Sequence, residues 1–343
     1  MPRRIRYGLI PLLLLISSVI IIASLLVGSE KISMAQAWAE WRAGIPLAEA
    51  PTLGIFINQR LPRTLAALIA GAGLALGGCT FQALLRNPLA TPYTLGVASA
   101  AALGAWTAFI LADAGWFVTG LFGITSIQAF AFLFAGADVL LVYLLASRKL
   151  HSSPTILLLA GVTMGMLANS GIMFTRYLAQ PDRLVMMDRW LMGGVDVLGY
   201  GPVLNLTFGV LPCIVILMAQ AGKYDQFGFG TEMAAGRGVN VTQLQLVTFF
   251  VGSLMVAIIV SEVGPIGFIG LIVPHAVRTI TGARHRLLMP VSLVAGGAFL
   301  CMCDIFARRM LPGETPIGIV TTLIGAPFFL YLLVRRRFTD WES

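Results

Sequence analysis

Long apolar runs separated by short polar connections fill most of this chain. A helix that crosses a bilayer needs about 20 mostly apolar residues, and about ten segments meet or approach that length, some of them short or kinked. These segments begin near Tyr7, Leu61, Thr94, Leu121, Pro154, Pro202, Val239, Ile266, Leu288 and Thr315. Because the connections leave no room for a soluble domain, we predict an all-α membrane protein of about ten transmembrane helices, with residues 1–343 as a single transmembrane domain.

One of the apolar runs is interrupted along its length. The segment from Glu262 to Arg278 reads EVGPIGFIGLIVPHAVR, and almost without charge it carries residues that break or weaken a helix: Gly264, Pro265, Gly267, Gly270 and Pro274. Irregular backbone is tolerated at membrane depth only where protein or a water-filled cavity surrounds it. The segment therefore predicts short broken helices along a transport pathway more than a passive anchor.

Composition and charge agree with a bilayer protein. Of the 343 residues, 58% are hydrophobic and only 11% are charged, too apolar a mixture for an average soluble domain. Lys and Arg accumulate in short cytoplasmic loops, and an even number of helices places both termini on one side. Fourteen of the 23 Lys and Arg residues fall on that side, so we predict cytoplasmic termini. The net charge of +8 then reflects topology, and no nucleic-acid partner is expected.

Candidate chemistry inside the spans is sparse. The four cysteines fall within predicted helices, and no P-loop, HExxH or GxSxG motif occurs, so we predict no catalytic residue, cofactor or metal site. A membrane-embedded enzyme or electron-transfer subunit is the alternative, and it would need midplane ligands or a nucleophile. An ion-coupled carrier has less support, because the intramembrane acids Asp138 and Asp304 lack proton-relay neighbours. Asp138 has no obvious partner, and the sequence leaves its role open.

Three long motifs resemble one family. They are RLPRTLAALIAGAGLALGGCTFQALLRNPLATPYTLG at Arg60 to Gly96, CDIFAR at Cys303 to Arg308, and ETPIGIVTTLIGAPFFLYLLVRRR at Glu314 to Arg337. Together they resemble the permease subunits of ATP-driven importers for iron-siderophores, haem and vitamin B12. The resemblance implies an inner-membrane permease that works as a homodimer with two ATP-binding cassette ATPase subunits and a periplasmic or surface substrate-binding protein. It does not select the cargo.

Three arginines are candidates for docking the binding protein. Arg60 and Arg63 lie three residues apart at the outer start of the second helix, hence on one face, and Arg308 ends the ninth helix near the same membrane surface. In the family that the chain resembles, the matching arginines receive acidic residues of the binding protein, and guanidinium groups pair bidentately with carboxylates. Alternatively, these arginines extend to lipid headgroups, or Arg308 pairs with Asp304 one turn earlier.

The longest internal polar connection on the inner side contains KYDQFGFGTEMAAGRGVN, from Lys223 to Asn240. It predicts a short helix over Thr231 to Ala235, followed by two glycines. The loop resembles the family's coupling helix, which implies that the residues at matching positions contact the ATPase: Glu232, Ala235, Gly236, Arg237 and Gly238. An ordinary solvated loop is the alternative.

Two shorter loops on the same side are candidates for a gate. RNPLATP, from Arg86 to Pro92, contains two prolines that stop the helix, so it holds Asn87 and Leu89 at a turn. Ser152 and Ser153 form a second turn before Pro154. The resemblance implies that both turns narrow the cytoplasmic exit of a path between two identical permeases, whereas the residues alone favour simple reverse turns.

Overall fold

A computed structural model describes residues 3–28, 32–47, 49–113, 125–147, 154–197, 199–310 and 315–335. Throughout these ranges every regular element is a helix, as the sequence predicts. In chain order the elements are α1 (Arg3–Leu26), α2 (Met34–Arg42), α3 (Pro51–Ile55), the π-helical η1 (Phe56–Arg60), α4 (Leu61–Leu85), the 3-10 helix η2 (Pro92–Leu95), α5 (Val97–Asp113), α6 (Ser126–Ser147), α7 (Pro154–Leu178), α8 (Pro181–Leu191), α9 (Gly201–Ala219), α10 (Ala221–Phe227), α11 (Thr231–Gly236), α12 (Val241–Val263), α13 (Ile269–Thr281), α14 (His285–Met310) and α15 (Ile317–Arg335).

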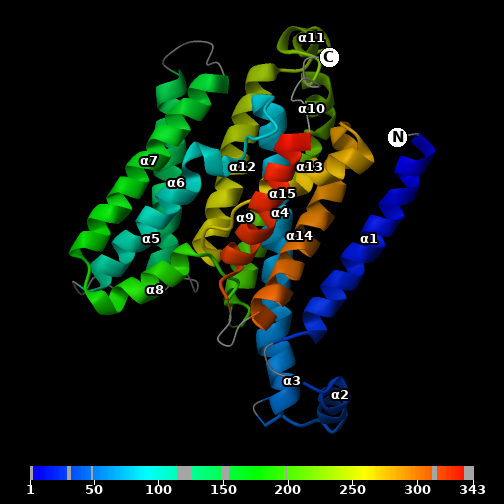
Figure 1. The fold of residues 1–343 in the computed structure, drawn as a ribbon, viewed down its shortest axis with the longest axis vertical. Helices are drawn as coiled ribbons and strands as arrows, with labels where there is room; N and C mark the ends of the chain where they lie inside the picture. Colours follow the sequence, from blue (N-terminus) through cyan, green and yellow to red (C-terminus); the bar gives the residue numbers. More distant parts are fainter. Residues whose placement is uncertain are drawn as a thin grey trace.

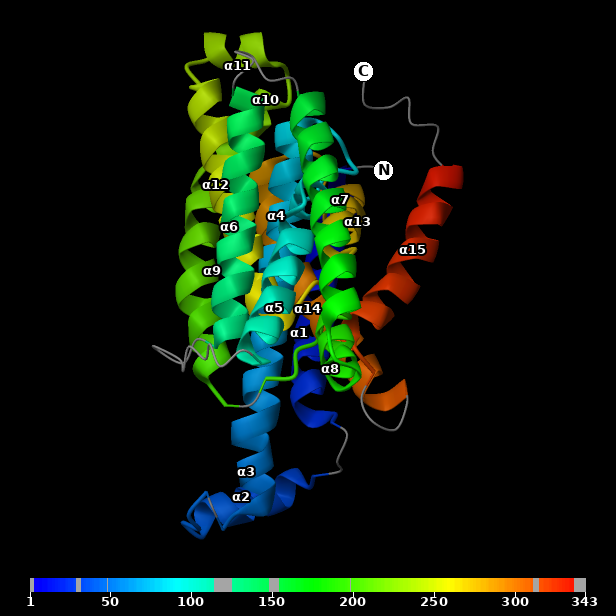
Figure 2. The ribbon, with the colours of Figure 1, turned by 90° about the vertical axis from the view of Figure 1, so that its left-hand side faces the viewer.

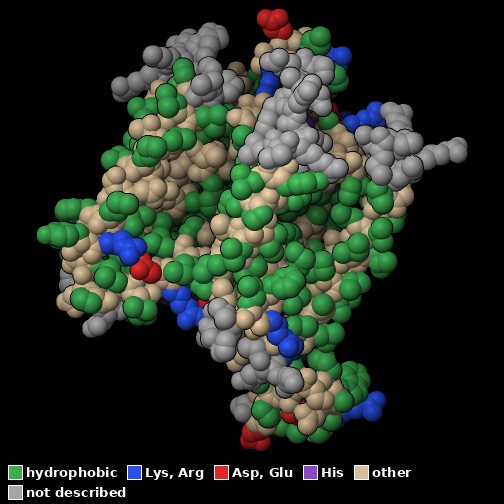
Figure 3. Space-filling view, in the orientation of Figure 1, with side chains coloured by type: hydrophobic (Ala, Val, Ile, Leu, Met, Phe, Trp, Pro, Cys, Tyr) green, Lys and Arg blue, Asp and Glu red, His purple; other side chains and the backbone are tan. Residues whose placement is uncertain are grey.

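Seven helical stretches within the described residues are long and apolar enough to cross a membrane: Gly8–Leu26, Pro51–Leu85, Ser126–Leu145, Ile156–Leu178, Gly201–Ala219, Val241–Val263 and His285–Met310. Three shorter apolar helices accompany them: Val97–Leu111, Ile269–Thr281 and Ile317–Tyr331. The visible face of the molecule presents mostly hydrophobic side chains around its middle, with charged groups toward the ends (Figure 3). A helical protein with several membrane spans is thus confirmed, while the number of ten crossings stays a prediction.

Helix α4 is the axis of the bundle. It packs against α14, α13, α12 and α9, and α5, α6 and α7 form a second group that joins this core through α12. Figure 1 shows this second group with α8 on one side of α4 and α1, which packs on α14, on the other. Nearly every residue of α4 from Ala66 to Leu85 is buried, so this helix contacts protein on all sides and not lipid.

Small residues allow these close contacts. A methyl group added at Gly78 of α4 would overlap the carbonyl oxygen of Gly270 in α13, and one added at Gly71 would overlap the carbonyl oxygen of Gly296 in α14. Membrane helices gain little from burying apolar surface against one another, because lipid is equally apolar, so they associate through such close packing. The glycines of LIAGAGLALGG are therefore needed where α4 crosses its neighbours.

The helix that contains α4 begins earlier than the sequence predicts. α3, η1 and α4 form one continuous rod from Pro51 to Leu85, with its start ten residues before Leu61. At about 1.5 Å per residue its 35 residues extend about 50 Å, beyond the roughly 30 Å hydrocarbon core of a bilayer. The rod projects from the bundle and carries α2 at its tip (Figure 2). Arg60 therefore lies inside a helix and not at its start.

The predicted interruption is confirmed between α12 and α13. α12 ends at Val263, the intervening residues are not helical, and Gly264 and Phe268 both have positive φ, of 70° and 68°. Protein groups satisfy backbone atoms that the break exposes. The carbonyl of Val263 accepts a hydrogen bond from Gly194 N at 2.9 Å, and Ile266 N donates to the Tyr93 hydroxyl at 2.9 Å. This arrangement is what irregular backbone at membrane depth requires.

The glycine packing makes a prediction about stability. Gly78→Ala should lower the free energy of unfolding by about 1–3 kcal/mol, because the new methyl group forces α4 and α13 apart. The measurement is the apparent melting temperature of the purified protein in detergent. Gly136→Ala in α6 is the matched control, since a methyl group there meets no atom within 4 Å. Equal melting temperatures for the two variants would show that the α4–α13 contact is not tight.

Candidate functional site

The residues that the sequence singles out lie at two opposite ends of the bundle. Arg63 and Arg308 contact Asp304 at the end from which the α3–α4 rod projects. The turn after α4 lies at the other end together with α10 and α11, because Arg86 bonds to Phe227 of α10 (Figure 2). We call these the outer end and the inner end.

A buried acid organises the outer end. The side chain of Asp304 in α14 is 0% exposed, and it pairs with Arg63 Nε at 2.9 Å and with Arg308 Nη2 at 2.6 Å. Arg63 also approaches Asp196 at 3.5 Å, and Arg189 approaches the same carboxylate at 3.5 Å. The cluster ties α4, α14 and the segment after α8 together.

Arg308 of this cluster and the nearby Arg60 also donate hydrogen bonds to the last turn of α1. Helix α1 has no basic residue in its own last turn, where free carbonyl groups create a partial negative charge. Arg308 Nη2 donates to the carbonyl of Ser24 at 3.3 Å, and Arg60 Nη1 donates to the carbonyl of Leu26 at 2.6 Å. Two arginines from distant parts of the sequence thereby satisfy the carbonyl groups of α1.

The structure places all three candidate docking arginines largely below the surface. Arg60 is 5% exposed and Arg308 is 6% exposed, and the side chain of Arg63 is 13% exposed. Arg60 faces α1 while Arg63 faces α14, so spacing along one helix did not place them in one exposed row. The alternative that Arg308 pairs with Asp304 is confirmed. At this end Arg189 is more open, with a side chain 59% exposed.

At the inner end, α4 stops at a tight turn. Its last residue is Leu85, and Arg86 takes the left-handed conformation with φ of 47°. The Asn87 side chain accepts a hydrogen bond from Leu89 N at 2.9 Å, a local turn typical of asparagine. Leu89, at this turn, is 37% exposed. Ser152 and Ser153, the other predicted gate residues, lie outside the described residues.

A cavity of about 170 Å³ separates this turn from the interrupted segment. Leu89 and η2 form one wall, and the other wall includes Ile266 and Phe268 from the break between α12 and α13. Two features that the sequence singled out separately are therefore neighbours in space. This cavity is smaller than the roughly 300–1,000 Å³ typical of small-molecule sites, so it has no room for a large ligand.

The predicted short helix at the inner end is α11. Among its residues only Ala234 is buried, whereas the candidate contact residues are exposed: Glu232, Ala235, Gly236, Arg237 and Gly238. The structure adds α10, which was not predicted, and two exposed apolar side chains, Phe229 at 66% and Met233 at 58%. In the sequence, the sign that Phe229 and Met233 are functional candidates is their apolar character within an otherwise polar loop. The exposed apolar side chains fit a contact with another protein.

Arg86 connects the turn after α4 to α10, a role that nothing in the sequence indicates. Its guanidinium donates to the carbonyl of Phe227 at 3.3 Å and lies over the Phe227 ring, 4.7 Å from the ring centroid. Phe227 is the last residue of α10, and Gly230, the N-cap residue of α11, follows three residues later. Asn87 follows Arg86 directly, so a displacement of α10 has a short route to the turn after α4.

Asp138 lies inside the bundle and not toward lipid. It is 2% exposed, and neither carboxyl oxygen has a hydrogen-bond partner among the described residues. Gly96, at the start of α5, is next to it, since a methyl group there would lie 3.2 Å from Oδ1. The structure thus places Asp138, whose role the sequence left open, at an interface between neighbouring elements of the bundle.

Comparison with known proteins identifies the family. The FecCD transport family matches residues 13–335. The vitamin B12 import system permease protein BtuC of Vibrio cholerae is 37% identical to this chain, with 80% of this chain and 81% of BtuC covered. The hemin transport system permease protein HmuU of Yersinia pestis is 34% identical, with 82% and 84% covered. The chain therefore belongs to the FecCD transport family, and it is an ABC transporter permease.

A solved structure supports the same assignment. It is described as an inward-facing conformation of a metal-chelate type ABC transporter, and it superposes with a TM-score of 0.82 at 28% identity. The match covers 96% of this chain and 99% of the other. The fold is thus shared over nearly the whole length of the two chains.

The buried cluster makes a prediction about the outer end. Asp304→Asn should lower the free energy of unfolding by about 3–5 kcal/mol, because the buried Arg308 and the partly buried Arg63 lose the carboxylate between them. The apparent melting temperature checks this expectation. Asp188→Asn is the control, since Asp188 pairs with Arg176 at a partly exposed site where a pair is worth about 0–1 kcal/mol. Equal changes in melting temperature for Asp304→Asn and Asp188→Asn would show that the cluster stabilises the protein no more than a surface ion pair does.

Proposed function

We propose that this permease carries a metal chelate, haem or a corrinoid through the cytoplasmic (inner) membrane, from a soluble binding protein at the outer end to the cytoplasm at the inner end. The names of two relatives, which specify hemin and vitamin B12, support this class of cargo. The three long motifs that resemble the same importers agree with it. The cargo class follows from similarity, and the direction follows from the features of the two ends.

One observation carries the importer proposal: α11 is an exposed short helix at the inner end. Its outward side chains include an acid, Glu232, and an apolar group, Met233, and Gly236 leaves open space around its backbone. Such a helix fits a cleft on a partner, because small residues permit close approach and apolar side chains gain from burial. The partners are two ATPase subunits, one for each copy of the permease.

The contact between Arg86 and Phe227 supplies the route from ATPase to gate. When the partner moves α11, α10 moves with it, since only Gly228 to Gly230 separate the two helices. Phe227 then displaces Arg86, which directly precedes Asn87 and Leu89. These two residues form the gate on the inner side, and Ser152 and Ser153 complete it from the loop before α7.

A second copy of the chain completes the path. The 170 Å³ cavity beside Leu89 is too small for a chelate, which supports a path between two copies. Helix α7 offers a face for this purpose, with exposed apolar side chains along its length: Leu159, Val162, Met166, Met173 and Tyr177. A twofold axis would bring the two Leu89 side chains toward each other at the inner end.

The binding protein docks at the outer end through guanidinium groups. Arg63 and Arg189 both pair with Asp196, whose side chain is 50% exposed. A carboxylate of the partner takes the place of Asp196 when it docks, which is the charge-assisted contact that arginine favours. Arg60 and Arg308 support this surface from within, because they hold α1 and α14 around it.

The orientation rests on charge and on the position of the helix ends. Lys223, Arg237, Arg284 and Arg286 belong to the inner end, which fits the cytoplasmic side. The start of α1 and the end of α15 lie toward the same end as α10 and α11 (Figures 1 and 2). Both termini are then cytoplasmic.

The coupling role of α11 is tested by Gly236→Trp. The fold should tolerate this change, because a side chain at Gly236 meets no atom within 4 Å, but the bulky ring should keep the ATPase away. We expect at least a tenfold loss of cargo-stimulated ATP turnover and of transport in proteoliposomes. Co-purification of the ATPase reports assembly directly.

The matched control is Gly201→Trp, at the outer start of α9. This glycine is also exposed and has open space around it, so the same substitution should leave ATP turnover unchanged. If Gly236→Trp assembles and transports like the unmodified protein, α11 does not engage the ATPase.

The gate and the second copy are tested by Leu89→Cys in a chain without the four native cysteines, which are all buried. The introduced thiols should crosslink between copies in at least one nucleotide state of the complex. Adding Arg86→Met should remove the dependence of crosslinking on nucleotide, because the link to Phe227 is lost.

Phe208→Cys controls for random collision, since Phe208 is 75% exposed on α9, away from α7. Reaction at position 208 with none at position 89 in every nucleotide state would remove Leu89 from the gate. Persistent nucleotide dependence with Arg86→Met would place the route to the gate elsewhere.

A further inference from the structure

A second cavity, of about 500 Å³, opens at the inner end where α9 meets α10 and the start of α14. Its walls combine apolar groups from the end of α9, Met218 and Ala219, with two cationic side chains, Lys223 and Arg286. Its volume lies within the roughly 300–1,000 Å³ typical of ligand sites. Neither the gate nor α11 forms part of it.

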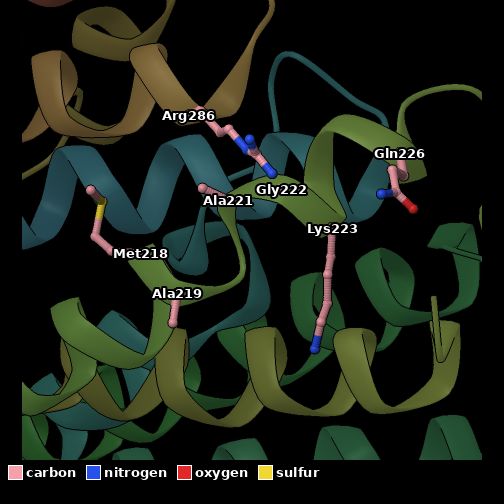
Figure 4. Close-up of a pocket in the computed structure, with 7 residues that line it drawn as sticks. All are labelled: Met218, Ala219, Ala221, Gly222, Lys223, Gln226 and Arg286. Atoms are coloured by element: carbon pink, nitrogen blue, oxygen red, sulfur yellow. The ribbon is translucent and has the colours of Figure 1, made fainter. Parts of the chain in front are cut away.

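The two cations bound the cavity from different elements. Figure 4 shows Arg286 extending from α14 toward Gly222, while Lys223 extends from the opposite side of α10. A methyl group on Gly222 would lie 3.0 Å from Arg286 Nη2, so the glycine lets the guanidinium rest close to α10. Among the residues that the structure describes, neither Lys223 nor Arg286 has an ion-pair partner.

Asp225, two residues after Lys223 on α10, is engaged with the start of α14. Burial alone would raise the pKa of Asp225, but hydrogen bonds with the ring and backbone nitrogen of His285, and with the backbone of Arg286, lower this pKa below its ordinary value. These bonds join α10 to the start of α14. Asp225 therefore fixes the two walls of the cavity relative to each other and does not neutralise the two cations by a salt bridge.

An exposed apolar stripe leads along α9 to this cavity. Leu204, Phe208, Leu211 and Val215 recur every three or four residues and are 51% to 75% exposed, so they form one face of the helix. The next position on that face is Ala219, in the cavity wall. Figure 2 shows α9 along one side of the bundle, with α10 at the inner end of the molecule.

We propose that the cavity binds the headgroup of an anionic phospholipid, with its acyl chains along the α9 stripe. Ammonium and guanidinium groups pair with phosphate, and basic pockets at the inner membrane surface attract anionic lipids. A free phosphate ion would use the two cations but not the stripe, whereas a phospholipid uses both. The assignment to the cytoplasmic leaflet rests on the proposed orientation. Binding at this site steadies α10 against α14.

The test titrates dioleoyl phosphatidylglycerol into the full-length permease, purified in detergent without any partner, and counts bound lipid by native mass spectrometry. We expect saturable binding, with dioleoyl phosphatidylcholine at least tenfold weaker. The double variant Lys223→Gln with Arg286→Gln should weaken phosphatidylglycerol binding about tenfold or more, the size expected for two basic groups near an anionic surface. Since no ATPase is present, the outcome does not depend on the proposed coupling role of α11.

Arg284→Gln is the matched control, because Arg284 is exposed two residues before Arg286 but does not line the cavity. It should bind phosphatidylglycerol within twofold of the unmodified protein. Circular dichroism and size-exclusion chromatography establish that each variant is folded. Unchanged lipid binding by the folded double variant overturns the proposal.

Two further results would also overturn it. Displacement of phosphatidylglycerol by millimolar inorganic phosphate would mean that the site recognises a free anion. Loss of ATPase co-purification by the double variant, with phosphatidylglycerol binding intact, would assign Lys223 and Arg286 to the partner interface.

Discussion

Every backbone polar group at membrane depth must find a partner inside the protein, and the structure depends on this constraint. At the outer end of α1 the partners are guanidinium groups, which reach its last carbonyls from η1 and α14. At the break between α12 and α13 they are Gly194 and the Tyr93 hydroxyl. Both solutions join elements that are distant in the sequence, so satisfying the backbone also fixes the bundle.

The same constraint changes the interpretation of the outer arginines. In water, Arg60 and Arg308 would be free to meet a partner protein, but here their donors hold α1 and balance Asp304. In the docking that we propose, the available charge is then limited to Arg63 and Arg189, which lie nearer the surface. Buried polar groups beneath such a surface would keep it rigid, which favours specific recognition over loose electrostatic attraction.

The inner end follows a different principle. Its elements are short, and contacts between distant residues link them: Arg86 donates to Phe227, and Asp225 bonds to the start of α14. Tyr224 and Phe227 also bury α10 in the core, whereas only Ala234 of α11 is buried. The molecule thus combines a stiff, glycine-packed axis with an exposed short helix at the inner end. In an ABC permease such a division would let ATP-driven changes at α11 reach the gate while the rest of the bundle stays intact.

The sequence alone determined the helical membrane class, the interruption after Glu262, the short helix α11 and the family, because apolar length, glycine and proline positions, and long motifs are local properties. It also offered the pairing of Arg308 with Asp304 as an alternative, since both lie on one helix, and the structure confirms that pair. Only the tertiary structure decided that Arg60 faces α1 and Arg63 faces α14, that Arg86 rests on Phe227, and that Lys223 and Arg286 border one cavity. Those facts depend on contacts between residues far apart in the chain, and helical spacing carries no information about which neighbouring helix a side chain meets.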